Sequence, residues 1–505
     1  MHRRTFLRAS VCAAAGTPAL ACTSSARQPP RSGGPRHDPS DMAAAVLDAD
    51  RKEVTKLAVD WTTRGASARD LLGAALLAGL REVNPSPIGG QVHAMMMVAS
   101  AAEVTGTLRG PDKLLPALFN LDRTKRSQKR DANARRGDWQ MPAPPPVEAA
   151  PVPELVDTLE RAMRSWDVDA ADQAITALHD TLSLDDFFEV LWPWAARDFR
   201  IIGHKAIYAT QTYRALQDLG WRQGRDAVRS LGFGVLDQNP YGRFSEDDSA
   251  AILGLFDDNR ERTHDIPAAW DRGAPSHEDA LTLLTKLRDA DADGAAKAVV
   301  QALRRGVAGL SAWDAVRLHA FELVARHPSI AGVHPVTSVN ALYRAASISR
   351  VDATRRLLLL QAASWMPLFG AFLASRPDLP QHELRVDAKP TAQTRPEDPF
   401  AASTREAAAA AAHHQLAQGD GAPFAARARA VLVRKAQDDH DYKYTVAALE
   451  EIGAAQPATR PFLAAAAMSY LQLANEDDSA LYRRARPLLD ELAARQASAA
   501  AARGR

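Results

Sequence analysis

Histidine and carboxylate side chains are the groups in this sequence that could hold a metal or move a proton. The only two cysteines, Cys12 and Cys22, lie near the N-terminus, so the chain after Cys22 has neither a disulfide nor a thiolate ligand. This excludes iron–sulfur clusters and cysteine-based zinc sites from that part. Iron or another transition metal bound there would rest on His, Asp and Glu, and the 14 histidines are the first candidates.

The segment that begins at His204 places three polar side chains on one face of a predicted helix. Gly203 marks the start of the helix, and His204, Tyr208 and Gln211 follow at i, i+4 and i+7. Such side chains need hydrogen-bond partners if they are buried. They form either a polar contact between helices or the wall of a pocket. In the pocket, His204 would be catalytic or bind a metal, and Tyr208 would orient it.

Two further histidines stand at the start of predicted helices. Pro335 is typical of a first helical position, so His334 is expected at a cap, where its ring could point into a cleft. His440 lies among carboxylates just before another helix. Either Asp441 fixes the tautomer of His440, as carboxylates do behind metal ligands, or the segment is a polar loop with a capping Asp. His204, His334 and His440 are thus the candidate metal ligands and catalytic residues, and Tyr208 and Asp441 are further catalytic candidates that would orient them.

Other histidine motifs carry a weaker signal. Glu261 and His264 form a Glu-x-x-His motif, but helical di-iron proteins use two such motifs and two further glutamates, so this pair is the weaker metal candidate. His93 precedes the run Met95–Met97. That run favours core packing over a copper site, because consecutive residues point around a helix. The sequence contains no nucleophile elbow, phosphate-binding glycine-rich loop or dinucleotide fingerprint.

The elements that position these residues are expected to be helices throughout. Apolar residues recur at helical spacing, and Ser67, Ser183 and Ser276 are typical N-caps. Roughly eighteen helical segments are expected, and no alternating strand pattern of useful length appears. The predicted fold is all-α, a multi-helical array of antiparallel helix pairs that could curve into a repeat-like superhelix. The net charge of +1 argues against a nucleic-acid partner.

Changes in composition divide the chain into predicted segments. N-terminal helices over 42–120 precede a basic and proline-rich loop over 121–153, which is either solvated, in contact with acidic headgroups, or a cover for a site. A central helical domain is predicted over 154–376 and a linker over 377–402. C-terminal helices over 403–496 and a frayed tail over 497–505 complete the chain.

The N-terminal segment resembles a twin-arginine export signal. Residues 3–8, RRTFLR, are similar to the consensus of two arginines, a variable residue and Phe-Leu-Lys, and the following stretch is too short to span a bilayer. Residues 1–21 are predicted to be a signal peptide and 22–41 a flexible linker. Cleavage follows Ala21, and residues 19–22 also fit a lipobox that would acylate Cys22. The resemblance implies export by the twin-arginine translocase to a bacterial periplasm or cell envelope, with a membrane anchor if Cys22 carries lipid.

Two segments, 204–216 and 334–342, resemble the histidine-centred helices of questin oxidase-like proteins. Those proteins are all-helical enzymes associated with oxygen-dependent ring cleavage of polyketides, and the fungal enzymes work inside cells, without an export leader. The resemblance implies an exported metal- or cofactor-dependent oxidoreductase that acts on a small organic substrate. The alternative from composition alone is a non-catalytic helical scaffold, tethered to a membrane, that binds a partner protein.

Overall fold

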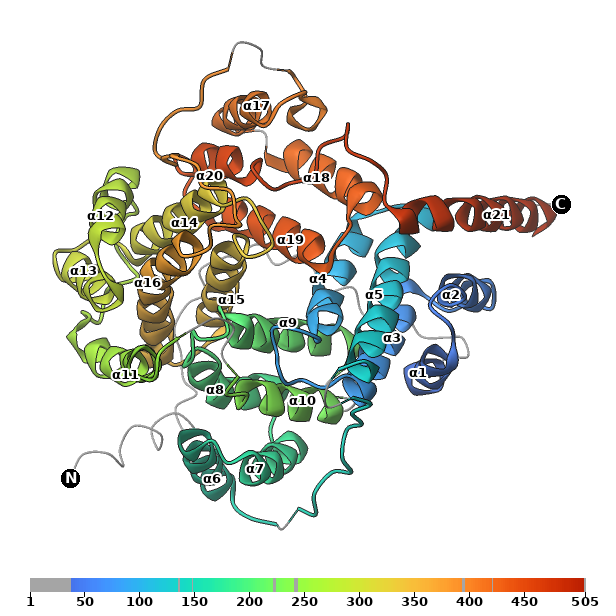
Figure 1. The fold of residues 1–505 in the computed structure, drawn as a ribbon, viewed down its shortest axis with the longest axis horizontal. Helices are drawn as coiled ribbons and strands as arrows, with labels where there is room; N and C mark the ends of the chain where they lie inside the picture. The colour runs from blue at the N-terminus through green and yellow to red at the C-terminus, as the bar shows by residue number, and fades with distance from the viewer. Residues whose placement is uncertain are drawn as a thin grey trace. The chain divides into compact units, whose positions relative to one another are not determined.

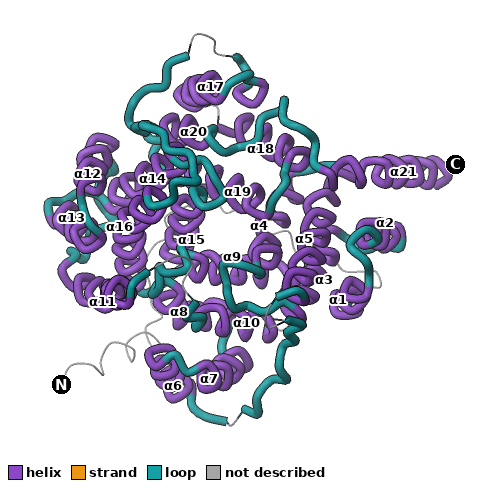
Figure 2. Tube along the Cα trace, viewed as in Figure 1, coloured by secondary structure: helices purple, strands orange, loops and turns teal. Residues whose placement is uncertain are grey.

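Helices account for most of the chain in the computed structural model, which describes residues 38–134, 137–147, 149–220, 224–239, 244–392, 396–419 and 421–503 (Figure 1). Within these ranges there are 21 α-helices and no strand (Figure 2). The predicted all-α class is confirmed, whereas the repeat-like superhelix stays a prediction. The export signal, most of the 22–41 linker and Cys22 lie outside the described residues.

Four central helices position the candidate site, and each starts at or beside a histidine. They are α4 His93–Thr107, α9 His204–Leu219, α15 His334–Ile348 and α19 Asp439–Ala454. In the packing, α4 contacts α9 and α19, and α15 contacts the same two helices, so the four form a closed ring. The ring joins parts of the chain that are far apart in sequence (Figure 1).

The four central helices run parallel and in register. On each of them, the tenth residue after the histidine is charged: Glu103, Arg214, Arg344 and Glu450. Arg214 pairs with both Glu103 and Glu450 at 2.9 Å, and Arg344 also pairs with Glu450. Ten helical residues span about 15 Å, so a layer of ion pairs lies that far from the histidines. This parallel group differs from the predicted antiparallel pairing, because long excursions through other helices separate its members.

Outer helices bury the central four on their remaining sides. α3 and α5 pack on α4, α8 and α10 on α9, α14 and α16 on α15, and α18 and α20 on α19. Ser67, Ser183 and Ser276 cap α3, α8 and α12 as predicted. The helices outside the central group are α1 Pro39–Asp48, α2 Val54–Thr63, α3 Ala68–Glu82, α5 Leu115–Ala132, α6 Val152–Ser165, α7 Val168–Thr181, α8 Leu184–Ala195, α10 Arg225–Val235, α11 Glu246–Arg262, α12 His277–Asp289, α13 Ala292–Arg304, α14 Gly309–Arg326, α16 Asp352–Ala374, α17 Arg405–Ala417, α18 Gly421–Lys435, α20 Arg460–Ala467 and α21 Ala480–Arg503.

Several predicted segment boundaries are wrong. Residues 121–132 belong to α5 and not to a loop, because this helix packs against α3 and α4 and buries most of its residues from Leu121 to Ser127. α6 already begins at Val152, and α21 continues through most of the predicted tail to Arg503. The predicted N-terminal, central and C-terminal segments are not separate domains either, since residues from Asp38 onward form one unit.

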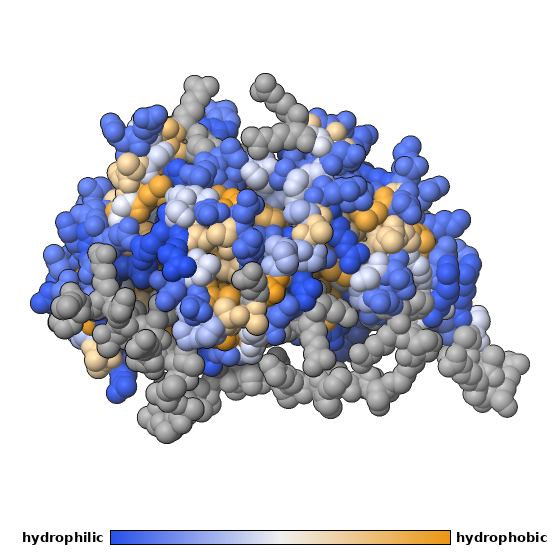
Figure 3. All heavy atoms as spheres, turned by 90° about the horizontal axis from the view of Figure 1, so that it is seen from below, coloured by the Kyte–Doolittle hydropathy of each residue, from blue (hydrophilic) through white to orange (hydrophobic). Residues whose placement is uncertain are grey.

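One helix, α16, is long and apolar enough to cross a membrane by length and composition alone. Most of it is buried against neighbouring helices, among them α13 and α15, as is usual for a core helix. The face of the molecule in Figure 3 is mostly hydrophilic, with small hydrophobic areas scattered over it. Scattered apolar side chains of this kind are normal on a folded protein.

Candidate metal centre

Four imidazole rings meet at the N-terminal end of the central helices. Neighbouring ring centroids lie 5.0 Å apart for His93 and His204, and 4.6 Å apart for His204 and His334. The ring closes through His440, at 5.2 Å from His334 and 4.4 Å from His93. All four side chains are buried. The structure thus brings together the three predicted histidines and adds a fourth, His93, which was interpreted from the sequence as a neighbour of core methionines.

Tight turns before α9 and α15 fix the orientation of two of these rings. The carbonyl of Ile201 accepts the backbone N–H of His204 at 3.1 Å and contacts its ring Nδ1 at 2.7 Å. Ala331 does the same for His334, at 3.3 and 3.2 Å. A carbonyl oxygen can only accept, so the neutral rings carry their proton on Nδ1. Nε2 is therefore the unprotonated nitrogen of both rings and is directed away from the turn.

The other two rings are held in a related way. Asp438 accepts from Nδ1 of His440 at 2.5 Å, and Nε2 of His440 is buried with no hydrogen-bond partner among the described residues. Nε2 of His93 donates to the carbonyl of Gly89 at 3.1 Å, so its Nδ1 carries the lone pair, which contacts Nζ of Lys443 at 2.5 Å. One ring nitrogen from each of the four histidines is unprotonated in these neutral tautomers.

Three of the four histidines bring ligand atoms close together, and the fourth contacts one of them. Ligand atoms of His93, His204 and His440 all lie within 4.8 Å of one another, and Nε2 of His334 lies 3.2 Å from Nε2 of His204. Two neutral imidazoles with protons on Nδ1 cannot donate to each other across that contact. Opposed lone pairs at this distance call for a positive centre between them, which is the arrangement that imidazole ligands have around a metal ion.

The surroundings hold the rings in their neutral form. Burial, followed by the charge of Lys443, lowers the pKa of His204 to about 3 and that of His440 below its usual value. Burial and the neighbouring charged groups lower the pKa of His93 and His334 well below 6.5. The positive ends of four helix dipoles point the same way and oppose protonation further. Neutral imidazole is the form that binds metals.

Lys443 is the cation nearest the rings. It is completely buried, and that burial lowers the pKa of its amine to about 8, although Asp439 and Asp438 oppose the shift. Its position one turn after His440 on α19 places Nζ against His93. A buried amine in this state can hold or release a proton near neutral pH.

A buried salt bridge fastens α5 to the start of α19. Arg123 donates to Asp439 at 2.5 Å and to Asp438 at 2.9 Å, and the side chains of Arg123 and Asp439 are both 6% exposed. Asp438 is at once the N-cap of α19, the partner of His440 and the partner of Arg123. Arg123 therefore holds the carboxylate of Asp438 in place, and Asp438 in turn fixes the orientation of the His440 ring.

Asp441 and Tyr208, which were predicted to orient the histidines, make other contacts in the structure. Asp441 accepts from the backbone N–H groups of Gln437 and Asp438 and closes a capping box, so Asp438 and not Asp441 orients His440. Side chains three residues apart meet across a helix start, whereas adjacent ones diverge. The hydroxyl of Tyr208 bonds Ser230 of α10 at 2.8 Å, which makes it a buried contact between helices.

The Glu-x-x-His motif, which is the weaker metal candidate, lies apart from the four histidines. Glu261 lies in the last turn of α11, His264 lies in the short 3₁₀ helix Thr263–Asp265, and both are exposed. Neither belongs to the four-histidine ring. Sequence reasoning also missed Asp438, Lys443 and His93. A signal was present for His93, because a glycine stands one to four residues before it, before His204 and before His334, each at a helix start.

Comparisons with known proteins do not place the chain in a family. No protein-family model matches it, and no curated protein or solved structure matches it either.

Proposed function

We propose that the protein is a metal-dependent oxidoreductase for a small organic substrate, in which His93, His204, His334 and His440 hold a transition-metal ion. The observation that carries the proposal is that ligand atoms of His93, His204 and His440 lie within 4.8 Å of one another, while Nε2 of His334 lies 3.2 Å from Nε2 of His204. A cation between the rings would bind Nε2 of His204 and of His334, and it would replace Lys443 at Nδ1 of His93. It would also give a partner to the buried Nε2 of His440.

The donor set suits a first-row metal. Imidazole binds iron, copper, nickel and zinc, and hydrogen bonds behind each ring raise its basicity and fix its tautomer. A redox-active ion held there would supply electron-transfer chemistry that the side chains lack. The choice of an oxidoreductase rests on the resemblance of segments 204–216 and 334–342 to questin oxidase-like proteins, and the assignment of iron rests on it too.

The chain's own residues would control water and protons at such a centre. The four rings are buried beneath outer helices, which keeps bulk water from the ring nitrogens. Lys443 holds a proton at Nζ beside Nδ1 of His93 and could pass it to a bound substrate. Asp438 holds the tautomer of His440, and Arg123 holds Asp438.

Metal analysis of the purified full-length chain tests the proposal. After reconstitution with ferrous iron or with Co²⁺ and removal of free ions, we expect about one ion per chain. The Co²⁺ form should show the visible absorption of nitrogen-ligated cobalt. His93→Ala and His440→Ala should each weaken metal retention about ten-fold or more while circular dichroism stays helical.

His264→Ala provides the matched control, because this exposed histidine lies outside the ring, and it should bind as much metal as the wild type. Less than about a fifth of an ion per chain after reconstitution with iron, cobalt, copper or zinc would overturn the proposal. So would unchanged retention in His93→Ala and His440→Ala together. The non-catalytic scaffold would then be the better interpretation of the fold.

A further inference from the structure

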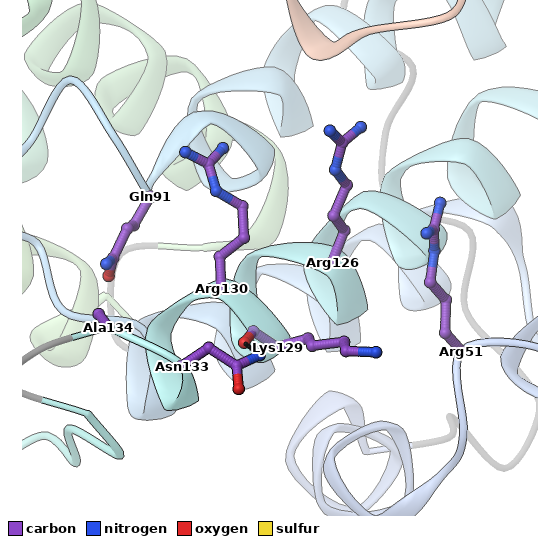
Figure 4. Close-up of a pocket in the computed structure, with 7 residues that line it drawn as sticks. All are labelled: Arg51, Gln91, Arg126, Lys129, Arg130, Asn133 and Ala134. Atoms are coloured by element: carbon purple, nitrogen blue, oxygen red, sulfur yellow. Dashed lines mark hydrogen bonds between the residues drawn. The ribbon is translucent and has the colours of Figure 1, made fainter.

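A basic pocket opens next to the loop that leads into His93. It has a volume of about 540 Å³ and is lined by Arg51, Gln91, Arg126, Lys129, Arg130, Asn133 and Ala134. Figure 4 shows Arg126 and Arg130 extending side by side from α5, with Gln91 to one side of them and Arg51 to the other. The volume falls in the range of small-molecule sites.

One of the four cations in this pocket has an ion-pair partner. Arg51 bonds Asp122 at 2.6 Å. Arg126, Lys129 and Arg130, by contrast, have no acidic partner among the described residues, although they lie within two turns of one helix. Three unpaired positive charges around one hollow attract an anion.

Two routes connect the pocket to the histidine ring. Gln91 lies in the middle of the loop between Gly89 and His93. A Cβ atom at Gly89 would lie 3.3 Å from Cε1 of His204, so the start of this loop packs on one ring and its end carries another. Two residues separate at most about 7.6 Å between Cα atoms, so Gln91 is close to both.

The second route runs along α5. Arg123, which holds Asp438 and Asp439 behind His440, is followed one turn later by Arg126 and one further turn later by Arg130. These three residues lie on one stripe of the helix. The stripe leads from the carboxylates behind the ring to the pocket.

We infer that this pocket binds the anionic group, a carboxylate or a phosphate, of a small organic substrate. The inference deepens the proposed function and rests on it for the reaction, but not for the binding. Arg126 and Arg130 would hold the anionic oxygens. Gln91, whose Oε1 is buried without a hydrogen-bond partner among the described residues, would accept from a hydroxyl or amino group on the part of the substrate nearer the ring.

Calorimetric titration of the full-length protein with three probes tests the inference. We expect salicylate or phenyl phosphate to bind, and the neutral salicylamide to bind about ten-fold more weakly or not at all. The anionic probe that binds more tightly identifies the favoured acid group. Arg126→Gln with Arg130→Gln should weaken anion binding about ten-fold, since each loses a charge-assisted hydrogen bond.

Arg304→Gln with Arg305→Gln is the matched control, because these two exposed arginines also lack an acidic partner among the described residues. Their replacement should change the affinity by less than about two-fold. Failure of both anions to bind, equal binding of salicylamide, or an effect of the control as large as that of the pocket variant would overturn the inference.

Metal binding by the histidines and anion binding in the pocket can be tested independently of each other. Anion binding should persist in His440→Ala, which is expected to retain little metal, and metal content should persist in the pocket variant. In the Co²⁺ form, the ion should speed the relaxation of salicylate protons more than that of salicylamide protons, which would place the anion near the ring. Equal relaxation of both probes would contradict a substrate site that joins pocket and ring.

Discussion

Nε2 of His204 and Nε2 of His334 lie 3.2 Å apart, although 130 residues separate them in the sequence. Each ring is turned by a backbone carbonyl three residues earlier, so neither can rotate away without losing that hydrogen bond. The contact is thus imposed by two turns and by the packing of α9 against α15. Both rings are buried and neutral, so the metal ion proposed above would lie between two nitrogens whose positions the fold already fixes.

Replacement of two nearby aspartates separates orientation of the ring from capping of the helix. Asp438→Asn keeps an N-cap but removes the carboxylate behind His440, so metal affinity should fall about ten- to hundred-fold. Asp441→Asn should leave metal affinity unchanged and lower the free energy of unfolding by about 1 kcal/mol, as loss of a capping contact does. Competition with a chelator and urea titration measure the two effects. Equal metal loss in both variants would contradict the assignment of Asp438.

Gly203 precedes His204 with φ of +77°, and an added Cβ would collide with Oγ of Ser338. Gly203→Ala should therefore lower the free energy of unfolding by about 3 kcal/mol, through backbone strain and overpacking, and loosen metal retention. Gly254→Ala is its control. Gly254 lies within α11 with no atom close to an added Cβ, so this change should stabilise by about 1 kcal/mol. Thermal or urea unfolding of both variants measures whether each change raises or lowers the free energy of unfolding.

Asp198 makes stability depend on acid pH. Burial alone would raise its pKa, but Lys205 and Arg200 outweigh burial and lower it from 3.8 to about 2. A carboxyl whose folded pKa is depressed stabilises the fold above its unfolded pKa and loses that effect as the pH falls towards the folded value. The contribution of about 2 kcal/mol should be nearly complete above about pH 5 and decline as the pH falls to about 2.

The measurement for Asp198 is urea unfolding between pH 5 and 2.5. The difference in unfolding free energy between the wild type and Asp198→Asn should shrink as the pH falls. Asp169→Asn, at an exposed position without an ion pair among the described residues, should shift stability by less than about 0.5 kcal/mol at every pH. A constant difference for Asp198→Asn would show that the charge of this carboxyl plays no part.

The all-α class and three of the four ring histidines could be predicted from the sequence, because helix starts have local signals. His204, His334 and His440 follow a glycine or an aspartate at such starts. His93 has the same signal, but the adjacent methionines suggested core packing, and both descriptions are true of it. That the four belong together could not be derived, because their proximity depends on the packing of helices from distant parts of the chain.

The hydrogen-bond partners of the residues beside the four histidines could not be predicted from the sequence either. The sequence does not distinguish Asp438, Asp439 and Asp441 as partners of His440. The backbone conformation at the N-cap of α19 decides which carboxylate contacts the ring. Tyr208 shares a helix face with His204, yet Ser230 of another helix takes its hydroxyl. One pattern could have helped: a charged residue follows each ring histidine by ten positions, with glutamates on α4 and α19 and arginines on α9 and α15.

The spread of the four central helices along the chain fixes when the centre can form. The first ring histidine is residue 93 and the last is residue 440, so a ribosome has made most of the protein before the set is complete. No fragment that ends before α19 contains all four imidazoles. Any ion that they hold would be captured late, after most of the chain has been made, and a truncation that removes α19 would leave an incomplete set of ligands.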